Sequence, residues 1–161
     1  TMKRFHPVPY GKKISVKGGV SFRLRDAGHI LGSAIVEVFA ERQKITFSGD
    51  LGNPPTPLLK TPEVIKTTDY ALVESAYGDR IHEDRGTRKD ILEDTIENTF
   101  TESGTLLIPA FALERTQEIL YELNDLVENN RIPRVPIFID SPLAIRITQI
   151  YKKYPQFFNK K

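Results

Sequence analysis

The spacing of apolar residues changes near residue 70, and this change limits the folds open to the chain. Before it, apolar and polar residues alternate over residues 14–16, 20–24, 34–38 and 45–47. This period of two is typical of half-buried antiparallel strands. After it, short apolar runs alternate with segments of helical period, which is typical of strand–helix repeats. The sequence therefore predicts an α/β protein made of two unlike halves.

Turn residues divide the first half into hairpins followed by a loop. Gly18 and Gly19 separate two alternating segments, and glycine pairs are typical of hairpin turns. The polar residues 41–43 separate the next two segments in the same way. Residues 53–62 contain four prolines, which suit neither a helix interior nor a central strand. A loop is therefore expected over residues 53–62.

The second half is predicted to alternate strands with helices in a parallel, doubly wound sheet. Leu92, Ile96 and Phe100 recur at four-residue spacing and form one apolar helical stripe. In chain order, the expected elements are a buried strand over 70–74, a helix from Thr87 to about Gly104, a strand over 105–109, a helix over 114–128, a strand over 135–139 and a helix from Ser141 to Tyr154.

Composition excludes several classes of protein and site. The 161 residues carry a net charge of +2, which excludes a histone-like nucleic-acid binder but not a local phosphate-binding groove. Cysteine is absent, so disulfide scaffolds, thiolate zinc fingers and cysteine nucleophiles are excluded. A metal must therefore bind Asp, Glu or one of the histidines, which are His6, His29 and His82. No apolar run approaches the roughly 18 residues of a membrane span and no signal peptide is recognisable, so a soluble, cytoplasmic protein without a membrane partner is expected.

The spacing predicts that His29 and Asp50 converge at one end of the sheet. His29 precedes the segment 34–38 and Asp50 follows the segment 45–47, and the two ends meet if these segments form a hairpin. Glycines beside both residues allow the close approach of a ligand. An imidazole and a carboxylate suit zinc, although a site needs at least three protein ligands. The alternative is structural, with a hydrogen-bonded turn histidine and an aspartate that caps its own turn.

Three more polar residues follow predicted strands. Glu74 ends the strand over 70–74, at the end of the strand where open α/β sheets place ligands. There it would orient a ligand histidine or move a proton. The structural alternative is that it caps the following loop. Arg115 lies near a helix start, where it opposes the helix dipole, and is a candidate for binding phosphate. Ser141 opens a helix whose free N–H groups suit a phosphate, with simple N-capping as the alternative.

Four segments together resemble the β-CASP family of metallo-β-lactamase-fold RNA-processing nucleases. They are residues 26–33 (DAGHILGS), 48–52 (SGDLG), 74–80 (ESAYGDR), and 108–118 followed by 139–144. The resemblance implies that residues 1–80 form antiparallel hairpins of the C-terminal half of a metallo-β-lactamase αββα sandwich. It also implies that residues 81–161 form a Rossmann-like, parallel-sheet segment of a β-CASP domain.

The same resemblance assigns roles to individual residues. It implies that His29 binds one zinc ion, that Asp50 bridges two, and that Glu74 supports catalysis by contacting a later histidine. Arg115 and Ser141 are expected to position the phosphates of RNA. Glu114 stands where many members of the family have glycine, which is a departure from the family's pattern.

Two absences indicate an internal fragment of a larger enzyme. The family's principal metal motif, His-x-His-x-Asp-His, and its later histidines are missing. The expected function is that of part of a ribonuclease with a dinuclear zinc site, and the isolated chain is expected to be inactive. RNA is the expected partner, with single-stranded DNA and a homo-oligomer left open. The alternatives are a non-catalytic nucleic-acid-binding or scaffold subunit of the same family, and a hydrolase of small phosphodiesters or esters.

Overall fold

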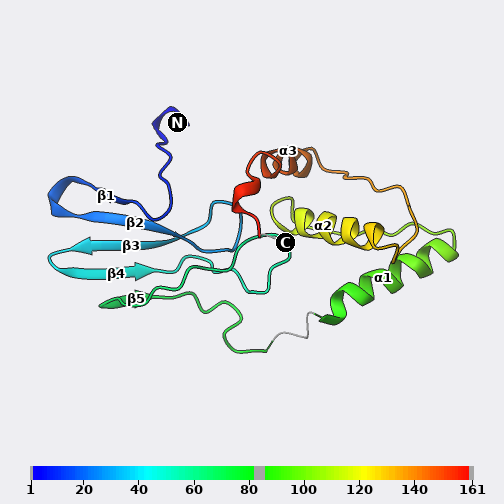
Figure 1. Ribbon diagram of the computed structural model, residues 1–161, viewed down its shortest axis with the longest axis horizontal. Coiled ribbons are helices and arrows are strands. Elements are labelled where there is room, and N and C mark those ends of the chain that lie inside the picture. Colours follow the sequence, from blue (N-terminus) through cyan, green and yellow to red (C-terminus); the bar gives the residue numbers. More distant parts are fainter. Residues whose placement is uncertain (1, 82–85, 160–161) are drawn as a thin grey trace. The chain divides into compact units, whose positions relative to one another are not determined.

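A computed structural model describes residues 2–81 and 86–159 of the chain (Figure 1). The chain divides into two compact units, Thr1–Ala76 and Tyr77–Lys161. In the first unit, four antiparallel strands follow one another across a sheet, and a fifth strand pairs in parallel with the fourth. The strands are β1 (Lys13–Ser15), β2 (Ser21–Asp26), β3 (Ala34–Ala40), β4 (Gln43–Phe47) and β5 (Tyr70–Leu72). The hairpins predicted from the period of two are confirmed.

The register of the sheet separates an apolar face from a polar face. Phe22 pairs with Ile14 and with Val38, which in turn pairs with Ile45, so these apolar side chains share one face. Glu37, one residue before Val38, therefore lies on the opposite face, where it is 1% exposed. The apolar residues thus share one face, as predicted, but the most buried residues of β3 and β4, Ile35, Glu37 and Thr46, lie on the opposite face, so the expectation that the apolar face is the buried one was wrong.

The strand predicted over residues 70–74 forms only as the three-residue β5, and it is not buried. Tyr70 and Leu72 are 55% and 54% exposed, and Val73 is 65% exposed. The prediction of a buried strand was wrong because β5 lies at the edge of the sheet, where it has one neighbouring strand. The predicted loop over residues 53–62 is irregular, as expected, and it buries Leu58 and Leu59.

The second unit contains the three predicted helices, which are α1 (Gly86–Thr101), α2 (Arg115–Glu128) and α3 (Pro142–Tyr151). Its core is a cluster made by α1, α2 and the chain after α2, with Ile96, Leu123, Leu126 and Ile132 buried. Helix α3 ends three residues before the predicted Tyr154. Pro155 explains why Tyr154 lies outside the helix, because a proline disfavours helical backbone in the residue before it.

The strands predicted over residues 105–109 and 135–139 do not form in the described part of the second unit. The Rossmann-like parallel sheet predicted for residues 81–161 was therefore wrong for this chain. A strand is held by hydrogen bonds to a neighbouring strand, and no described residue of the unit pairs with either segment. Their apolar side chains line an open cavity of about 990 Å³, where Leu107 and Phe138 are 82% and 87% exposed.

Three helical turns complete the described structure. Short 3-10 helices span Met2–Arg4, Lys17–Gly19 and Pro155–Phe157. The second of them connects β1 to β2 at the two glycines that predicted a hairpin turn, and Gly18 there has a φ of +77°. The positive φ explains why glycine occupies this turn.

Candidate metal-binding loops and helix starts

Two glycine-containing loops meet where β3 begins and β4 ends. The loop with His29 precedes β3, and the loop with Asp50 follows β4. The backbone N–H of Gly52 donates a hydrogen bond to the carbonyl of Ala27 at 2.8 Å and so links the loops directly. The predicted approach of the two segments is confirmed, while the binding of a metal by His29 and Asp50 stays a prediction.

Glycine is required where the two loops touch. A Cβ atom on Gly52 would lie 1.9 Å from the carbonyl oxygen of Gly28, which is far inside van der Waals contact. A Cβ atom on Gly28 would lie 2.5 Å from the carbonyl oxygen of Lys60, and Gly28 has a φ of +59°. The contact surface of the two loops is therefore backbone against backbone, which no other residue type permits.

The loop before β3 holds its backbone with short-range hydrogen bonds. The N–H groups of His29 and Ile30 donate to the Ser33 hydroxyl at 3.1 and 3.2 Å, while the His29 side chain is exposed. The Tyr10 hydroxyl donates to the carbonyl of Ser33 at 2.7 Å. Burial, with help from the nearby carboxylates of Asp26 and Glu63, raises the pKa of Tyr10 to about 12, so that its hydroxyl keeps its proton even above pH 10.

Glu74 lies next to the Asp50 loop and holds it by two contacts. One carboxylate oxygen, Oε1, accepts a hydrogen bond from the backbone N–H of Leu51. The backbone N–H of Glu74 donates to the Ser48 hydroxyl at 2.9 Å. Glu74 thus caps the loop that follows β4. The structural alternative predicted that it would cap the loop after its own strand, β5.

The exposed side chains of His29 and Asp50 fit part of a zinc coordination sphere. Both donor types are common zinc ligands, and both project from loops that are fixed to each other. Two ligands do not complete a site, and no group of three or more His, Asp or Glu capable of holding a metal occurs within residues 2–81 and 86–159. His6 lies away from this set in the sequence, and His82 falls outside the described residues.

The two predicted phosphate-binding residues of the second unit both have local partners. Arg115 is the first residue of α2, and its guanidinium donates to the Glu118 carboxylate at 2.8 Å while remaining half exposed. The Ser141 hydroxyl accepts a hydrogen bond from the N–H of Ala144 at 3.2 Å and caps α3. Ser141 thus makes the N-capping contact of the structural alternative, and the pairing with Glu118 offsets the unfavourable dipole position of Arg115.

The departure at Glu114 has a visible structural consequence. Glu114 has φ and ψ angles of 64° and −59°, and the N–H of Arg115 donates to the carbonyl of Leu113 at 2.9 Å. These are the features of a γ-turn of the strained type, which glycine adopts more easily. The side chain is 9% exposed, and its carboxylate accepts a hydrogen bond from the Tyr151 hydroxyl of α3.

We expect this contact to compensate for the backbone strain at Glu114. Tyr151→Phe should lower the free energy of unfolding of the second unit by about 1–3 kcal/mol, because it removes a donor from a buried carboxylate. In a Glu114→Gly background the same change should cost little. Urea unfolding followed by circular dichroism measures all four proteins, and equal costs in both backgrounds would contradict the coupling.

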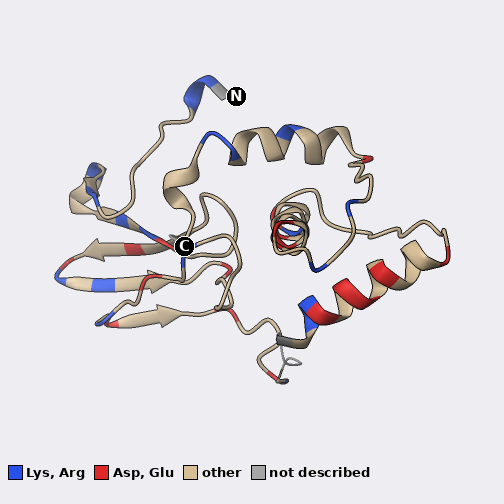
Figure 2. Ribbon diagram, turned by 45° about the vertical axis from the view of Figure 1, so that its right-hand side comes forward, with Lys and Arg blue, Asp and Glu red and all other residues tan. Residues whose placement is uncertain are grey.

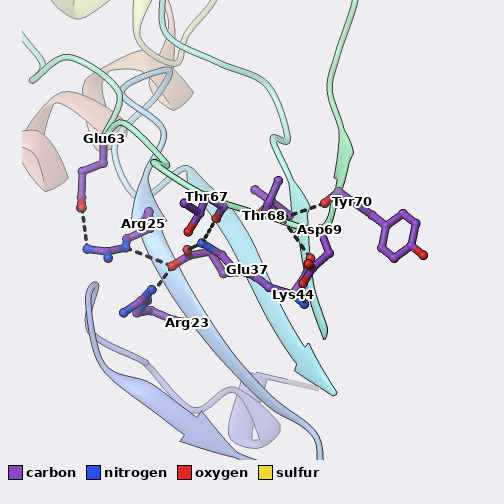
Figure 3. Close-up of polar contacts among 10 residues, drawn as sticks. Arg23, Arg25, Glu37, Lys44, Glu63, Thr67, Thr68, Asp69 and Tyr70 are labelled. Atoms are coloured by element: carbon purple, nitrogen blue, oxygen red, sulfur yellow. Dashed lines mark hydrogen bonds and ion pairs between the residues drawn. The ribbon is translucent and has the colours of Figure 1, made fainter. Parts of the chain in front are cut away.

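An ionic cluster that was not predicted from the sequence lies on the polar face of the sheet (Figure 3). Glu37 of β3 pairs with Arg23 at 2.5 Å, with Arg25 at 3.1 Å and with Lys44. Burial alone raises the pKa of Glu37, but the hydrogen bonds from Arg23, Lys44 and Arg25 outweigh it and lower the pKa to about 2. The overlooked signal is the two-residue spacing of Arg23 and Arg25 on the strand beside Glu37.

Charge is distributed differently in the second unit, where acidic residues run along α1 (Figure 2). Arg131 bridges two of them, Asp90 at 2.8 Å and Glu93, and Lys89 pairs with Asp125 of α2. An acidic helix surface repels a polyanion, so α1 is not a suitable contact for nucleic acid. Among the described residues, no helix is long and apolar enough to cross a membrane.

Comparisons with known proteins match these segments to RNA-cleaving enzymes. A family model described as the Beta-Casp domain matches residues 116–161. Ribonuclease TTHA0252 of Thermus thermophilus is 39% identical over 155 residues, which is 96% of this chain and 35% of that protein. RNase aCSPSF2 of Saccharolobus solfataricus is 33% identical, over 99% of this chain and 32% of that protein. Cleavage and polyadenylation specificity factor subunit 3-I of Arabidopsis thaliana is 31% identical, over 96% of this chain and 22% of that protein.

The chain thus spans only about a third, or less, of the length of the relatives that it matches. The matches nevertheless cover both units, since they extend along nearly all of its residues. The resemblance found in the motifs is therefore confirmed: the chain is similar along nearly all of its length to proteins named as ribonucleases, and a Beta-Casp domain model matches part of its second unit.

Proposed function

We propose that this chain is part of a cytoplasmic, zinc-dependent ribonuclease. The observation that carries the proposal is the direct backbone contact between the His29 and Asp50 loops. That contact brings an imidazole and a carboxylate to one end of the sheet, and relatives along the whole chain are named as ribonucleases. Residues 1–80 would then belong to a metallo-β-lactamase αββα sandwich and residues 81–161 to a β-CASP domain.

In this proposal His29 and Asp50 would hold zinc at the end of the sheet where β3 begins and β4 ends. His29 would hold zinc through a ring nitrogen, and Asp50 would hold it through its carboxylate. Zinc, when bound, acts as a Lewis acid that stabilises charge on the phosphoryl oxygens of RNA. The remaining ligands would come from residues of the parent protein, because His29 and Asp50 are fewer than the three ligands that a zinc site needs.

The second unit is proposed to contact the RNA backbone. Arg115 is half exposed at the start of α2, and its ion pair with Glu118 is a surface pair that is easily exchanged for a phosphate. The N-terminus of α3, capped by Ser141, offers further N–H groups to a phosphate. Contacts of this kind position a substrate without reading its sequence.

Calorimetric zinc titration of the chain tests the metal site. We expect weak binding that His29→Ala and Asp50→Ala each weaken by about tenfold or more, since each removes one of few ligands. His6→Ala is the matched control and should leave the affinity unchanged. A labelled RNA should not be cleaved by the isolated chain. Robust cleavage of RNA by the isolated chain would contradict the proposal. A zinc affinity that neither His29→Ala nor Asp50→Ala changes would contradict it as well.

The incomplete donor set also favours a second candidate, which is a non-catalytic RNA-binding or scaffold subunit. In that case the parent protein would bind RNA in the presence of a chelator and would not cleave it when zinc is supplied. A cleavage assay on the parent protein with RNA, single-stranded DNA and a small phosphodiester separates this candidate from a nuclease and from a small-molecule hydrolase.

A further inference from the structure

The loop that presents Asp50 is anchored on both sides of that residue. On the N-terminal side, Ser48 donates its N–H to the carbonyl of Leu72 at 2.9 Å and accepts from the N–H of Glu74 through its hydroxyl. On the C-terminal side, the N–H of Leu51 donates to the Glu74 carboxylate. Asp50 lies between these anchors with its side chain exposed. Glu74 takes part in both.

The anchoring matters because the loop itself is short and conformationally free. Gly49 has a φ of +56°, and because glycine populates positive and negative φ about equally, neighbouring contacts must select this backbone direction. The Glu74 side chain reaches this loop and supplies an oxygen that accepts from the Leu51 N–H, as an uncharged amide oxygen of the same reach also could. Glu74 therefore holds in place the backbone from which the Asp50 side chain projects.

The geometry points to Glu74 as the positioning residue for Asp50. Its carboxylate fixes the N–H of Leu51, so that Asp50 is presented beside the His29 loop before any metal binds. This inference rests on the proposed function for the role of Asp50, and it departs from the sequence-based expectation that Glu74 acts on a later histidine. Because the backbone of Glu74 is held by Ser48, a shorter aspartate side chain is not expected to reach the Leu51 N–H.

Three substitutions of Glu74 distinguish positioning of the Asp50 loop from proton transfer and from action through charge. Glu74→Ala removes the acceptor, Glu74→Asp shortens it, and Glu74→Gln keeps an acceptor oxygen of the same reach without the charge. If Glu74 positions Asp50, Ala and Asp should behave alike and Gln should resemble the native chain. If Glu74 instead moves protons or acts by charge, Gln should fail together with Ala.

Amide hydrogen exchange by NMR, in the absence of metal, reads the contact itself. We expect the exchange of the Leu51 amide to become about tenfold faster or more in Glu74→Ala and Glu74→Asp, and to stay close to native in Glu74→Gln. Glu63→Ala is the matched control, since it removes a comparable contact from a carboxylate to the N–H of Asp26. It should leave the exchange of Leu51 unchanged.

Zinc titration of the same proteins then tests the consequence. We expect the affinity to fall by about 10–100-fold in Glu74→Ala, as for other residues that orient a ligand, and to be rescued by Glu74→Gln. Unchanged Leu51 exchange in Glu74→Ala, or zinc affinity that falls in Glu74→Gln as much as in Glu74→Ala, would overturn the inference. Failure of Asp50→Ala to weaken zinc binding would instead overturn the proposed metal site, and the Leu51 exchange would still report on Glu74.

Discussion

Replacing Gly52 with alanine is expected to force apart the two loops that carry His29 and Asp50. The new Cβ atom would lie 1.9 Å from the carbonyl oxygen and 2.4 Å from the carbonyl carbon of Gly28. Backbone atoms cannot rotate away as the end of a long side chain can, so one loop must move. Overpacking of this kind costs about 1–3 kcal/mol and occasionally more, and we expect the upper part of that range.

The expected loss extends to metal binding. Because the Gly52 N–H donates to the carbonyl of Ala27, a displaced loop also loses the hydrogen bond that joins the two segments. Zinc affinity should therefore fall about as far as in Asp50→Ala. Urea unfolding followed by circular dichroism and zinc titration measure the two effects.

Gly104→Ala provides the control for Gly52→Ala. The nearest neighbours of a Cβ atom at Gly104 are atoms of Thr99 at 3.4 Å, which is ordinary contact. That variant should keep native stability and native zinc affinity. A Gly52→Ala protein that is as stable as the control and binds zinc as the native chain does would show that the two loops do not depend on their close contact.

The period of two predicted the first unit well because its strands find their partners within the chain. The hairpin of β3 and β4 places the start of one strand beside the end of the other, and this placed the His29 and Asp50 loops together. What spacing could not provide was the role of Glu74. Its hydrogen bond to Leu51 depends on the parallel pairing of β5 with β4, which no local pattern encodes.

The second unit departs from the prediction where a segment depends on distant partners. The helices form because their hydrogen bonds are internal and their apolar stripes meet in one core. Residues 105–109 and 135–139 are equally apolar, but a strand needs a neighbour, and within the described residues they line an open cavity instead. Periodicity identifies the apolar residues that are expected to be buried. It does not identify the strands or helices that would pack against them.

Glu37 shows the same limit for charged residues. Glu37 occupies a polar position of the alternating pattern, which predicts an exposed side chain, whereas in the folded sheet it is buried. In the folded sheet, register places Arg23 directly opposite Glu37, and Arg25 and Lys44 reach it from either side. The cluster therefore results from three strands in one register, although each residue alone is unremarkable in the sequence.

Glu37→Gln is expected to destabilise the first unit by about 1.5–3 kcal/mol at neutral pH, because it removes the charge that strengthens the hydrogen bonds from three partly exposed cations. Glu37 is 1% exposed, and Arg23, Arg25 and Lys44 all point toward it (Figure 3). Glu41→Gln, in the exposed turn after β3, is the matched control and should change the free energy of unfolding by no more than about 0.5 kcal/mol. Urea unfolding followed by circular dichroism measures both.

The advantage of the native chain over Glu37→Gln should depend on pH in a defined direction. The three basic partners lower the folded-state pKa of Glu37 from 4.5 to about 2. A lowered folded-state pKa contributes stability that is fully present above the unfolded-state pKa and is lost as the pH falls toward the folded-state pKa. That difference in pKa corresponds to about 3 kcal/mol.

The gap in unfolding free energy between the native chain and Glu37→Gln should therefore be constant above about pH 5 and shrink between about pH 4.5 and pH 2. Other carboxylates titrate in both proteins and largely cancel, so a gap that is the same at both ends of this window would show that Glu37 is not held ionised by its partners.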